Sequence, residues 1–221
     1  MSDAKAPVGL RRPPVPVAIS AGRVIAIARN LDPALVPAIG EAVLAGGIGA
    51  FEVTLNSPAA LDAIAMLRDR FAPEDLLIGG GTILDVEQAQ RAVEAGAQFV
   101  VMPHVDLSIV EWAAEQGIPA FPGAFTPTEI LAAWRAGAAA VKLFPASAVG
   151  PAFVRELRGP LPEIPLIPTG GVTLENAPAF LQAGALAVGM GSWLTGGANP
   201  DLIRERALAV AAAVSEAGRR I

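Results

Sequence analysis

One lysine of this chain lies in an apolar segment, where a charged side chain is unexpected. The chain has two lysines, Lys5 near the N-terminus and Lys142 between Val141 and Leu143, against fourteen arginines. A charged amine in apolar surroundings costs several kcal/mol unless it is paired or neutralised. Burial favours the neutral amine, which is the nucleophile that forms a Schiff base with a carbonyl group. The alternative is a lysine whose aliphatic stem packs on apolar surface while its charge reaches water.

A carboxylate follows the same pattern in residues 50–55. Side chains of an extended segment alternate between two faces, so Glu52 and Thr54 share one face and their apolar neighbours share the other. Lys142 and Phe144 alternate with apolar residues in the same way. If both segments line one interior, Glu52 is placed to move protons and Lys142 to form an imine. A structural ion pair between the two is the alternative.

The rest of the chain indicates which elements position these residues. Helical segments that end in glycine alternate with short apolar runs, and several begin at a typical helix-capping residue: Asp32, Ser57, Asp85, Thr126 and Thr173. The apolar runs predict eight strands, at residues 23–29, 50–55, 76–82, 99–103, 119–123, 140–145, 165–171 and 187–192. Helices are predicted at residues 33–45, 57–71, 85–95, 107–116, 126–136, 152–158, 174–183 and 200–217.

This alternation predicts an α/β fold with a parallel sheet. Eight strand–helix units within 221 residues favour a single-domain (β/α)8 TIM barrel. We interpret residues 1–22 as an N-terminal extension and residues 23–221 as the barrel. An open, doubly wound sheet is the alternative, but the Gly-x-Gly-x-x-Gly fingerprint that such folds often carry does not open the first helix.

The ends of two predicted strands indicate a phosphate site. Gly170 and Gly171 end the seventh strand, and Gly191 and Ser192 end the eighth. Barrel enzymes carry their active sites at the C-terminal ends of the strands, and the loops after these two strands frequently bind phosphate. Glycine lets backbone N–H groups approach an anion closely. A tight turn that needs glycine for its own geometry is the alternative.

The third predicted strand ends in three glycines and Thr82. This run lacks the Gly-Lys-Ser/Thr ending of a phosphate-binding P-loop. We interpret it as backbone kept bare for the close approach of a small substrate, with the Thr82 hydroxyl as a hydrogen-bond donor. A turn that packs against its neighbours is the alternative. His104, after the fourth strand, is expected to have a secondary role at most.

Composition excludes several classes of function. The net charge of −5, the pI of about 4.9 and the lack of a basic stripe argue against nucleic acid binding. The chain has no cysteine and one histidine, which excludes thiol catalysis and a multi-histidine metal centre. No targeting signal is evident, and glycine and proline interrupt the charge-free residues 176–200. We therefore expect a soluble cytoplasmic protein without a membrane segment.

Together these motifs resemble those of the class I, Schiff-base aldolases that cleave 2-keto-3-deoxy-6-phosphogluconate (KDPG). Sister enzymes act on the galactonate epimer and on 4-hydroxy-2-oxoglutarate (KHG). The matching segments span nearly the whole folded chain: residues 52–55, 79–82, 95–99, 126–129, 141–145, 168–172 and 188–193. The resemblance implies that Lys142 is the Schiff-base lysine and Glu52 the general acid/base.

The same resemblance implies how the substrate is held. Arg29, Thr82 and Pro103 would line the keto-acid pocket, and the phosphate would be held by Gly170, Gly171, Gly191 and Ser192. Thr54, Phe144 and Thr169 complete the substrate-binding candidates. The implied partners are a phosphorylated 2-keto-3-deoxy sugar acid and pyruvate, with no cofactor and no metal, and the implied assembly is a homotrimer.

Two positions give opposite indications of the substrate epimer. Asn56 stands where many KDPG aldolases have arginine, and Asn-Ser-Pro at residues 56–58 resembles the galactonate branch. Thr169, before the glycine pair, resembles the gluconate branch, since the other branch tends to have an apolar residue there. Its hydroxyl can hydrogen-bond a substrate hydroxyl. Ser147 also replaces a common acidic residue, and Arg29 remains as the candidate ligand of the substrate carboxylate.

We predict cleavage of KDPG to pyruvate and glyceraldehyde 3-phosphate. The galactonate epimer or KHG is the alternative substrate. A phosphosugar-binding barrel without imine chemistry is less favoured because the metal ligands or the different acid/base pair that it would need are not evident. A catalytically inactive barrel is less favoured because both Lys142 and Glu52 are present.

Overall fold

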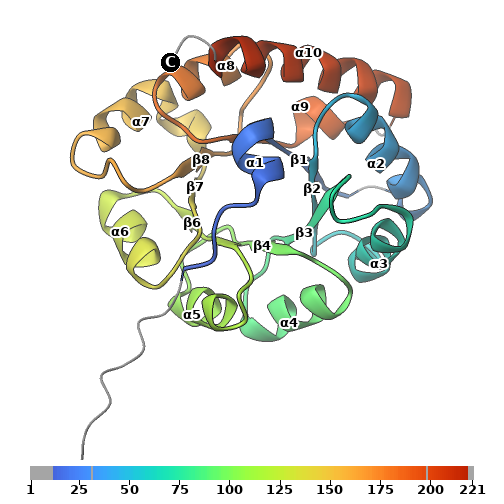
Figure 1. The fold of residues 1–221 in the computed structure, drawn as a ribbon, viewed down its shortest axis with the longest axis horizontal. Helices are drawn as coiled ribbons and strands as arrows, with labels where there is room; N and C mark the ends of the chain where they lie inside the picture. Colours follow the sequence, from blue (N-terminus) through green and yellow to red (C-terminus); the bar gives the residue numbers. More distant parts are fainter. Residues whose placement is uncertain (1–11, 31, 198, 219–221) are drawn as a thin grey trace, which may run out of the picture.

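Residues 12–30, 32–197 and 199–218 are described by the structure, a computed structural model. Its strands surround a common centre, and all its helices except α1 lie outside them (Figure 1). The strands are β1 (Val24–Ala28), β2 (Ala50–Thr54), β3 (Leu77–Gly81), β4 (Phe99–Val101), β5 (Ala120–Phe121), β6 (Gly123–Ala124), β7 (Val141–Leu143), β8 (Leu166–Pro168) and β9 (Val188–Met190). Each predicted strand is therefore found, the fifth being divided into β5 and β6 at Pro122.

All strand pairs are parallel, as the sequence predicts. Six strands form one curled sheet in the order β5-β4-β3-β2-β1-β9, and three form a second in the order β6-β7-β8. At one edge Pro122 connects the two sheets, because it lies between β5 and β6 in the chain. At the other edge a parallel bridge pairs Thr169, which follows β8, with Gly189 of β9. In this register Glu52 of β2 lies opposite Gly79 of β3.

Most of the helices and helical turns cover the outside of the strands, and α1 lies over the centre of the ring (Figure 1). They are α1 (Val17–Gly22), η1 (Pro33–Leu35), α2 (Val36–Ala45), α3 (Ala60–Arg70), α4 (Val86–Glu94), α5 (Leu107–Glu115), α6 (Pro127–Arg135), η2 (Ala146–Ala148), α7 (Gly150–Arg158), α8 (Ala177–Gln182), α9 (Ser192–Thr195) and α10 (Pro200–Gly218). Every predicted helix is found, but α1 and α9 were not predicted. None of the described helices is long and apolar enough to cross a membrane.

The predicted helix caps are partly correct. Asp85 caps α4, Thr126 forms a capping box with Glu129 at the start of α6, and Asp32 caps the turn η1. The predicted cap at Ser57 was wrong, because α3 begins only after Ala59. The Ser57 hydroxyl instead accepts a hydrogen bond from Asn30 N–H at 2.9 Å. The predicted cap at Thr173 was also wrong, because α8 begins after Asn176.

Two groups of buried apolar residues stabilise the fold. The larger lies between strands and helices and contains Phe51, Val53, Val141 and Leu143. The smaller fills the interior that the strands enclose and contains Ile25, Ile27, Leu77, Phe99, Val101, Phe121, Ala140 and Ile167. Every strand is buried on both faces, which explains why the strand segments are continuous apolar runs in the sequence.

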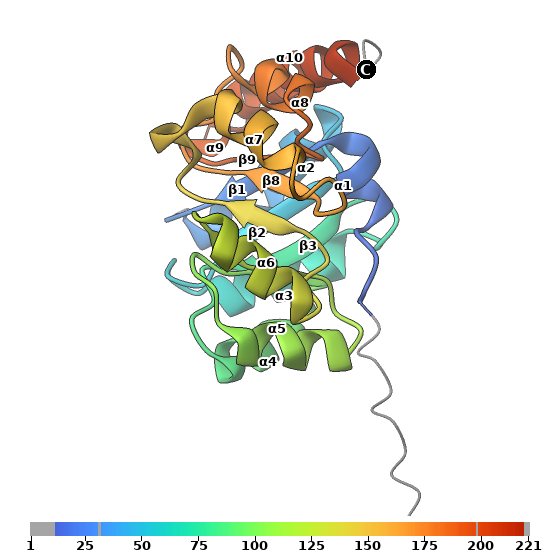
Figure 2. The ribbon, with the colours of Figure 1, turned by 90° about the vertical axis from the view of Figure 1, so that its left-hand side faces the viewer.

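Helix α1 packs against one end of the strands. Its Ile19 is fully buried and belongs to the interior group, and Ala18 is the nearest side chain to Gly49, just before β2. Figure 1 shows α1 over the centre of the ring of strands, and Figure 2 shows it beside one end of them. Residues 17–22, within the predicted extension, therefore cover the amino-terminal end of the interior. The predicted boundary at residue 22 stays a prediction.

Candidate active site

The lysine and the carboxylate lie inside the ring of strands. Lys142 projects from β7 and Glu52 from β2, and their exposed fractions are 4% and 2%. Val141 and Leu143 face the helices while Ala140 belongs to the interior group, so the predicted alternation is confirmed. Among the described residues, Glu52 and Lys142 form no ion pair within 4.0 Å. The two charges nevertheless influence each other, so the alternative of a structural role for the pair stays open.

Burial shifts the proton affinities of both groups. Desolvation raises the pKa of the Glu52 carboxyl, and the positive charges of Lys142 and Arg29 act in the opposite direction. Desolvation lowers the pKa of the Lys142 amine, the charge of Glu52 opposes this, and Arg29 adds to it. A lysine with a lowered pKa supplies the neutral amine that attacks a carbonyl carbon. A carboxyl with a raised pKa can hold and release a proton nearer neutral pH.

Lys142 lines a cavity of about 470 Å³ at the carboxyl ends of the strands. Its amine lies 4.9 Å from the centre of the Phe144 ring. The lining residues are Ile27, Arg29, Lys142, Phe144, Thr169, Gly170, Gly171, Val172, Thr173, Gly191, Ser192 and Trp193. The structure thus brings Lys142, Arg29, Phe144, Thr169 and all the predicted phosphate residues around one space.

Two glycine-containing loops form one end of this cavity. Gly170 and Gly171 have φ angles of 90° and 73°, which glycine adopts readily. Gly170 C=O accepts a hydrogen bond from Ser147 N–H at 3.0 Å. A side chain at Gly191 would meet nothing closer than 3.9 Å. The end of the cavity formed by these loops can therefore accept an anion.

A buried threonine holds the second loop in place. The hydroxyl of Thr195 donates to Ile27 C=O at 2.6 Å and lies 3.2 Å from Gly191 C=O. Its exposed fraction is 3%. It thus ties the loop of Gly191 and Ser192 to β1, next to Arg29. Thr195 was not among the predicted site residues, because nothing in the neighbouring sequence distinguishes it from other threonines.

Three predicted substrate residues lie outside the lining of this cavity. Thr54 is fully buried and shares a hydrogen bond of 2.9 Å with the Ser57 hydroxyl. Pro103 lines a neighbouring cavity of about 430 Å³ that also contains His104 and shares Phe144 with the first. Thr82 has a φ of 56°, a strained value for a β-branched residue.

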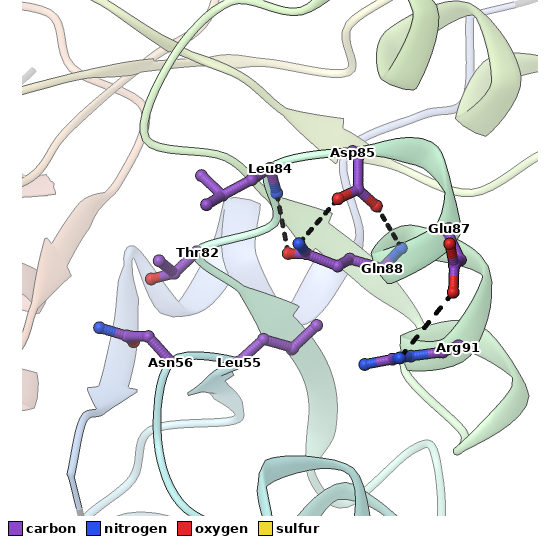
Figure 3. A pocket seen from close by; sticks show the side chains of 8 residues that line it. All are labelled: Leu55, Asn56, Thr82, Leu84, Asp85, Glu87, Gln88 and Arg91. Atoms are coloured by element: carbon purple, nitrogen blue, oxygen red, sulfur yellow. Dashed lines mark hydrogen bonds and ion pairs between the residues drawn. The ribbon is translucent and has the colours of Figure 1, made fainter.

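Thr82 lines a third cavity, of about 490 Å³ (Figure 3). Figure 3 shows Thr82 and Asn56 on one side and α4 on the other, where Gln88 hydrogen-bonds Asp85. Glu87 and Arg91 face each other at 4.0 Å. Its volume is close to that of the cavity beside Lys142, but its lining does not include Lys142, and Glu52 lines neither of the two cavities. We therefore assign the chemistry to the cavity that contains Lys142.

The glycines of β3 have a different use from the expected one. A side chain at Gly79 would meet the Phe99 ring, one at Gly80 would lie 2.9 Å from Ala92 Cβ, and one at Gly81 would meet Glu52. At all three positions the space is thus already filled by protein atoms. The idea that this backbone is bare for substrate approach is corrected in favour of the packing alternative.

Comparison with known proteins agrees with this geometry. The family model described as "KDPG and KHG aldolase" matches residues 17–209. A probable 2-dehydro-3-deoxy-6-phosphogalactonate aldolase of Rhizobium meliloti (strain 1021) is 37% identical over 191 residues, 86% of this chain and 90% of that protein. A 2-dehydro-3-deoxy-phosphogluconate aldolase of Treponema pallidum (strain Nichols) is 39% identical over 157 residues, 71% of this chain and 74% of that protein.

A solved structure adds a chemical observation. The KDPG aldolase of Legionella pneumophila, solved with pyruvate captured at low pH as a covalent carbinolamine intermediate, is 30% identical to this chain. The two superpose with a TM-score of 0.81 over 87% of this chain and 96% of the other.

Proposed function

We propose that this chain, which belongs to the family of KDPG and KHG aldolases, cleaves KDPG to pyruvate and glyceraldehyde 3-phosphate through a Schiff base on Lys142. The observation that carries the proposal is a buried amine with a lowered pKa at the wall of a cavity that Gly170, Gly171 and Gly191 also line. The carbinolamine seen in the Legionella pneumophila relative supports the same covalent chemistry.

The reaction begins at the amine. Neutral Lys142 attacks the C2 ketone, and loss of water from the resulting carbinolamine gives a protonated imine. Glu52 then takes the proton of the C4 hydroxyl, directly or through a water molecule, and the C3–C4 bond breaks. Its electron pair moves into the imine, which becomes an enamine, while glyceraldehyde 3-phosphate leaves. Protonation of the enamine at C3 and hydrolysis of the imine release pyruvate and restore the amine.

The remaining candidates would hold the substrate at its two ends. Arg29, Thr82 and Pro103 would bind the keto-acid end, with Thr54 supporting them through its bond to Ser57. Gly170, Gly171, Gly191 and Ser192 would bind the phosphate through backbone N–H groups. Phe144 and Thr169 would contact the carbon chain between them, since both line the cavity beside Lys142.

The galactonate epimer is the alternative substrate, because named relatives act on each epimer. We favour the gluconate for the hydroxyl of Thr169, whose exposed fraction is 6% and which donates to Ile167 C=O at 3.2 Å. Its oxygen lone pairs remain able to accept a hydrogen bond from a substrate hydroxyl. KHG would use the same imine without the phosphate end of the cavity.

The barrel itself is part of the proposal. We infer that β5 and β6 are two halves of one strand, because Pro122 between them still accepts a hydrogen bond from Lys142 N–H at 2.9 Å. Counted in this way, and closed through the Thr169–Gly189 bridge, the strands would make a (β/α)8 barrel. The cytoplasmic location predicted from the sequence belongs to the same proposal.

A homotrimer is the assembly that we propose. Large apolar side chains are exposed at the starts of three successive helices on the carboxyl side of the strands, namely Leu84, Leu107 and Phe125, with exposed fractions of 51%, 43% and 38%. Such side chains support an interface between copies of the chain. Sedimentation equilibrium would measure the mass, and a monomer at micromolar concentration would contradict the trimer.

Borohydride reduction in the presence of pyruvate tests the central step. Reduction traps an imine as a stable amine, so intact mass should show one adduct and peptide mapping should place it on Lys142. Lys142→Arg keeps a positive charge without a nucleophilic amine and serves as the control, which should form no adduct. An adduct on Lys5, or none at all, would overturn the proposal.

A further inference from the structure

The side chain of Glu52 lies across the backbone of Gly81. In the register of the sheet Glu52 is opposite Gly79, and Gly81 is the diagonal neighbour two residues further along β3. A Cβ atom on Gly81 would lie 2.5 Å from Glu52 Cδ and 2.6 Å from its Cγ, closer than real Cβ contacts. The carboxylate therefore leans toward the carboxyl ends of the strands, where the cavity is.

The space directly opposite Glu52 is taken by an aromatic ring. A Cβ atom on Gly79 would lie 2.6 Å from Cδ2 of Phe99, which is paired with Gly79 in the register of β3 and β4. The carboxylate thus has no room at Gly79 and has room at Gly81. Two glycines on the interior face of β3 thus leave room for two different side chains: Gly79 for the ring of Phe99, and Gly81 for the carboxylate of Glu52.

We propose that Gly81 is a positioning residue, whose missing side chain fixes where the Glu52 carboxylate sits relative to Lys142. The inference rests on the proposed function, since it assigns a purpose to the position of the general acid/base. The contact is with the far end of a flexible side chain, so an alanine at residue 81 should move the carboxylate and leave the strand in place. The φ of Gly81 is outside the left-handed region, so alanine brings no backbone strain of that kind.

Gly81→Ala and Gly80→Ala form a matched pair for the test. Both glycines are buried neighbours in β3, and each substitution adds one methyl group. The methyl group at residue 80 would contact Ala92 and Leu55, on the helix side of the sheet, at 2.9 Å and 3.4 Å. It therefore overpacks the same strand without touching Glu52.

Cleavage of KDPG and trapping of pyruvate are measured in both variants. Gly81→Ala should lower kcat by roughly 10²–10⁴-fold, the range for loss of a general acid/base, while still forming the borohydride-trapped adduct. Gly80→Ala should keep kcat within about fivefold of the wild type, because an overpacked helix contact costs stability and not proton transfer. Equal kcat values in the two variants would overturn the role of Gly81.

A rescue experiment separates positioning from general damage. Glu52→Asp shortens the side chain by one methylene, which makes the single variant slower than the wild type but leaves room for a methyl group at residue 81. The double variant Glu52→Asp/Gly81→Ala should therefore cleave faster than Gly81→Ala alone, a coupling expected only of residues in contact. A double variant as slow as, or slower than, Gly81→Ala would contradict the inference.

Two further outcomes have clear meanings. If the wild type neither cleaves KDPG nor traps pyruvate, the proposed function fails and this inference fails with it. If Gly81→Ala unfolds at a lower temperature than Gly80→Ala, the Tm of Glu52→Ala/Gly81→Ala decides. Removal of the Glu52 side chain should restore the Tm if the two residues collide, and no recovery would overturn the inference.

Discussion

Replacement of Thr195 by valine should weaken both the fold and the binding of phosphorylated substrate. Valine keeps the shape of threonine and removes the hydroxyl, which donates to Ile27 C=O at 2.6 Å. The site is 3% exposed, so water cannot readily replace the lost donor. The backbone bonds from Leu194 and Thr195 N–H to Gly191 C=O, at 2.8 Å and 2.9 Å, remain. The perturbation is therefore confined to the link between the loop and β1.

The expected magnitude follows from the environment of that bond. A typical hydrogen bond contributes about 0.5–1.5 kcal/mol, and a buried group left unpaired costs about 1–3 kcal/mol. We therefore expect the free energy of unfolding to fall by about 1–3 kcal/mol. For a chain of this length each kcal/mol lowers Tm by roughly 2–4 °C, which gives a decrease of about 2–12 °C. Urea unfolding and thermal unfolding would measure both quantities.

The effect on function should depend on the phosphate. Thr195 fixes the loop of Gly191 and Ser192, so KM for KDPG should rise while the trapping of pyruvate, which has no phosphate, stays unchanged. Thr195→Ser keeps the hydroxyl and serves as the control, with KM near that of the wild type. An unchanged KM and Tm in Thr195→Val, or an equal loss with pyruvate, would refute this account of Thr195.

Three further substitutions test the remaining assignments. Glu52→Gln should lower kcat by roughly 10²–10⁴-fold and still trap pyruvate; turnover near the wild-type rate would make Glu52 structural. Gly191→Val should place a side chain in the open end of the cavity and raise KM for KDPG without loss of pyruvate trapping, and equal loss of both would indicate misfolding. Thr169→Val should lower the preference for the gluconate epimer, measured as the ratio of kcat/KM values, by about 2–12-fold, the worth of one hydrogen bond; an unchanged ratio, or a wild type that prefers the galactonate, would reject Thr169 as the discriminator.

The parts of the site that follow from local alternation were predictable from the sequence. Glu52 and Lys142 each sit in a short apolar strand, and the two-residue period of a strand alone places them on the interior face. The glycines at the ends of β8 and β9 were predictable as loop backbone for the same local reason. These predictions need no knowledge of which strand lies beside which.

Contacts between distant segments were not predictable. Ser57 was taken for a helix cap, but its hydroxyl bonds Asn30 N–H, a contact set by the relative position of the β1 and β2 ends. Likewise nothing in the sequence distinguishes the three glycines of β3 from one another. Each faces a different side chain, because the register of the sheet decides which residue lies opposite it. Local propensity gives an element its type, whereas its neighbours decide what its residues do.

Helix α1 shows how a segment distant from the cavity contributes to its chemistry. Residues 17–22 follow a proline-rich stretch and show no helical period long enough to be recognised. In the fold, Ile19 is fully buried in the interior group, at the opposite end of the strands from Arg29. The pKa shifts of Glu52 and Lys142 have burial as their first cause, and burial inside the strands requires that water be excluded from both ends. By closing the amino-terminal end, α1 contributes to the burial that lowers the pKa of the Lys142 amine.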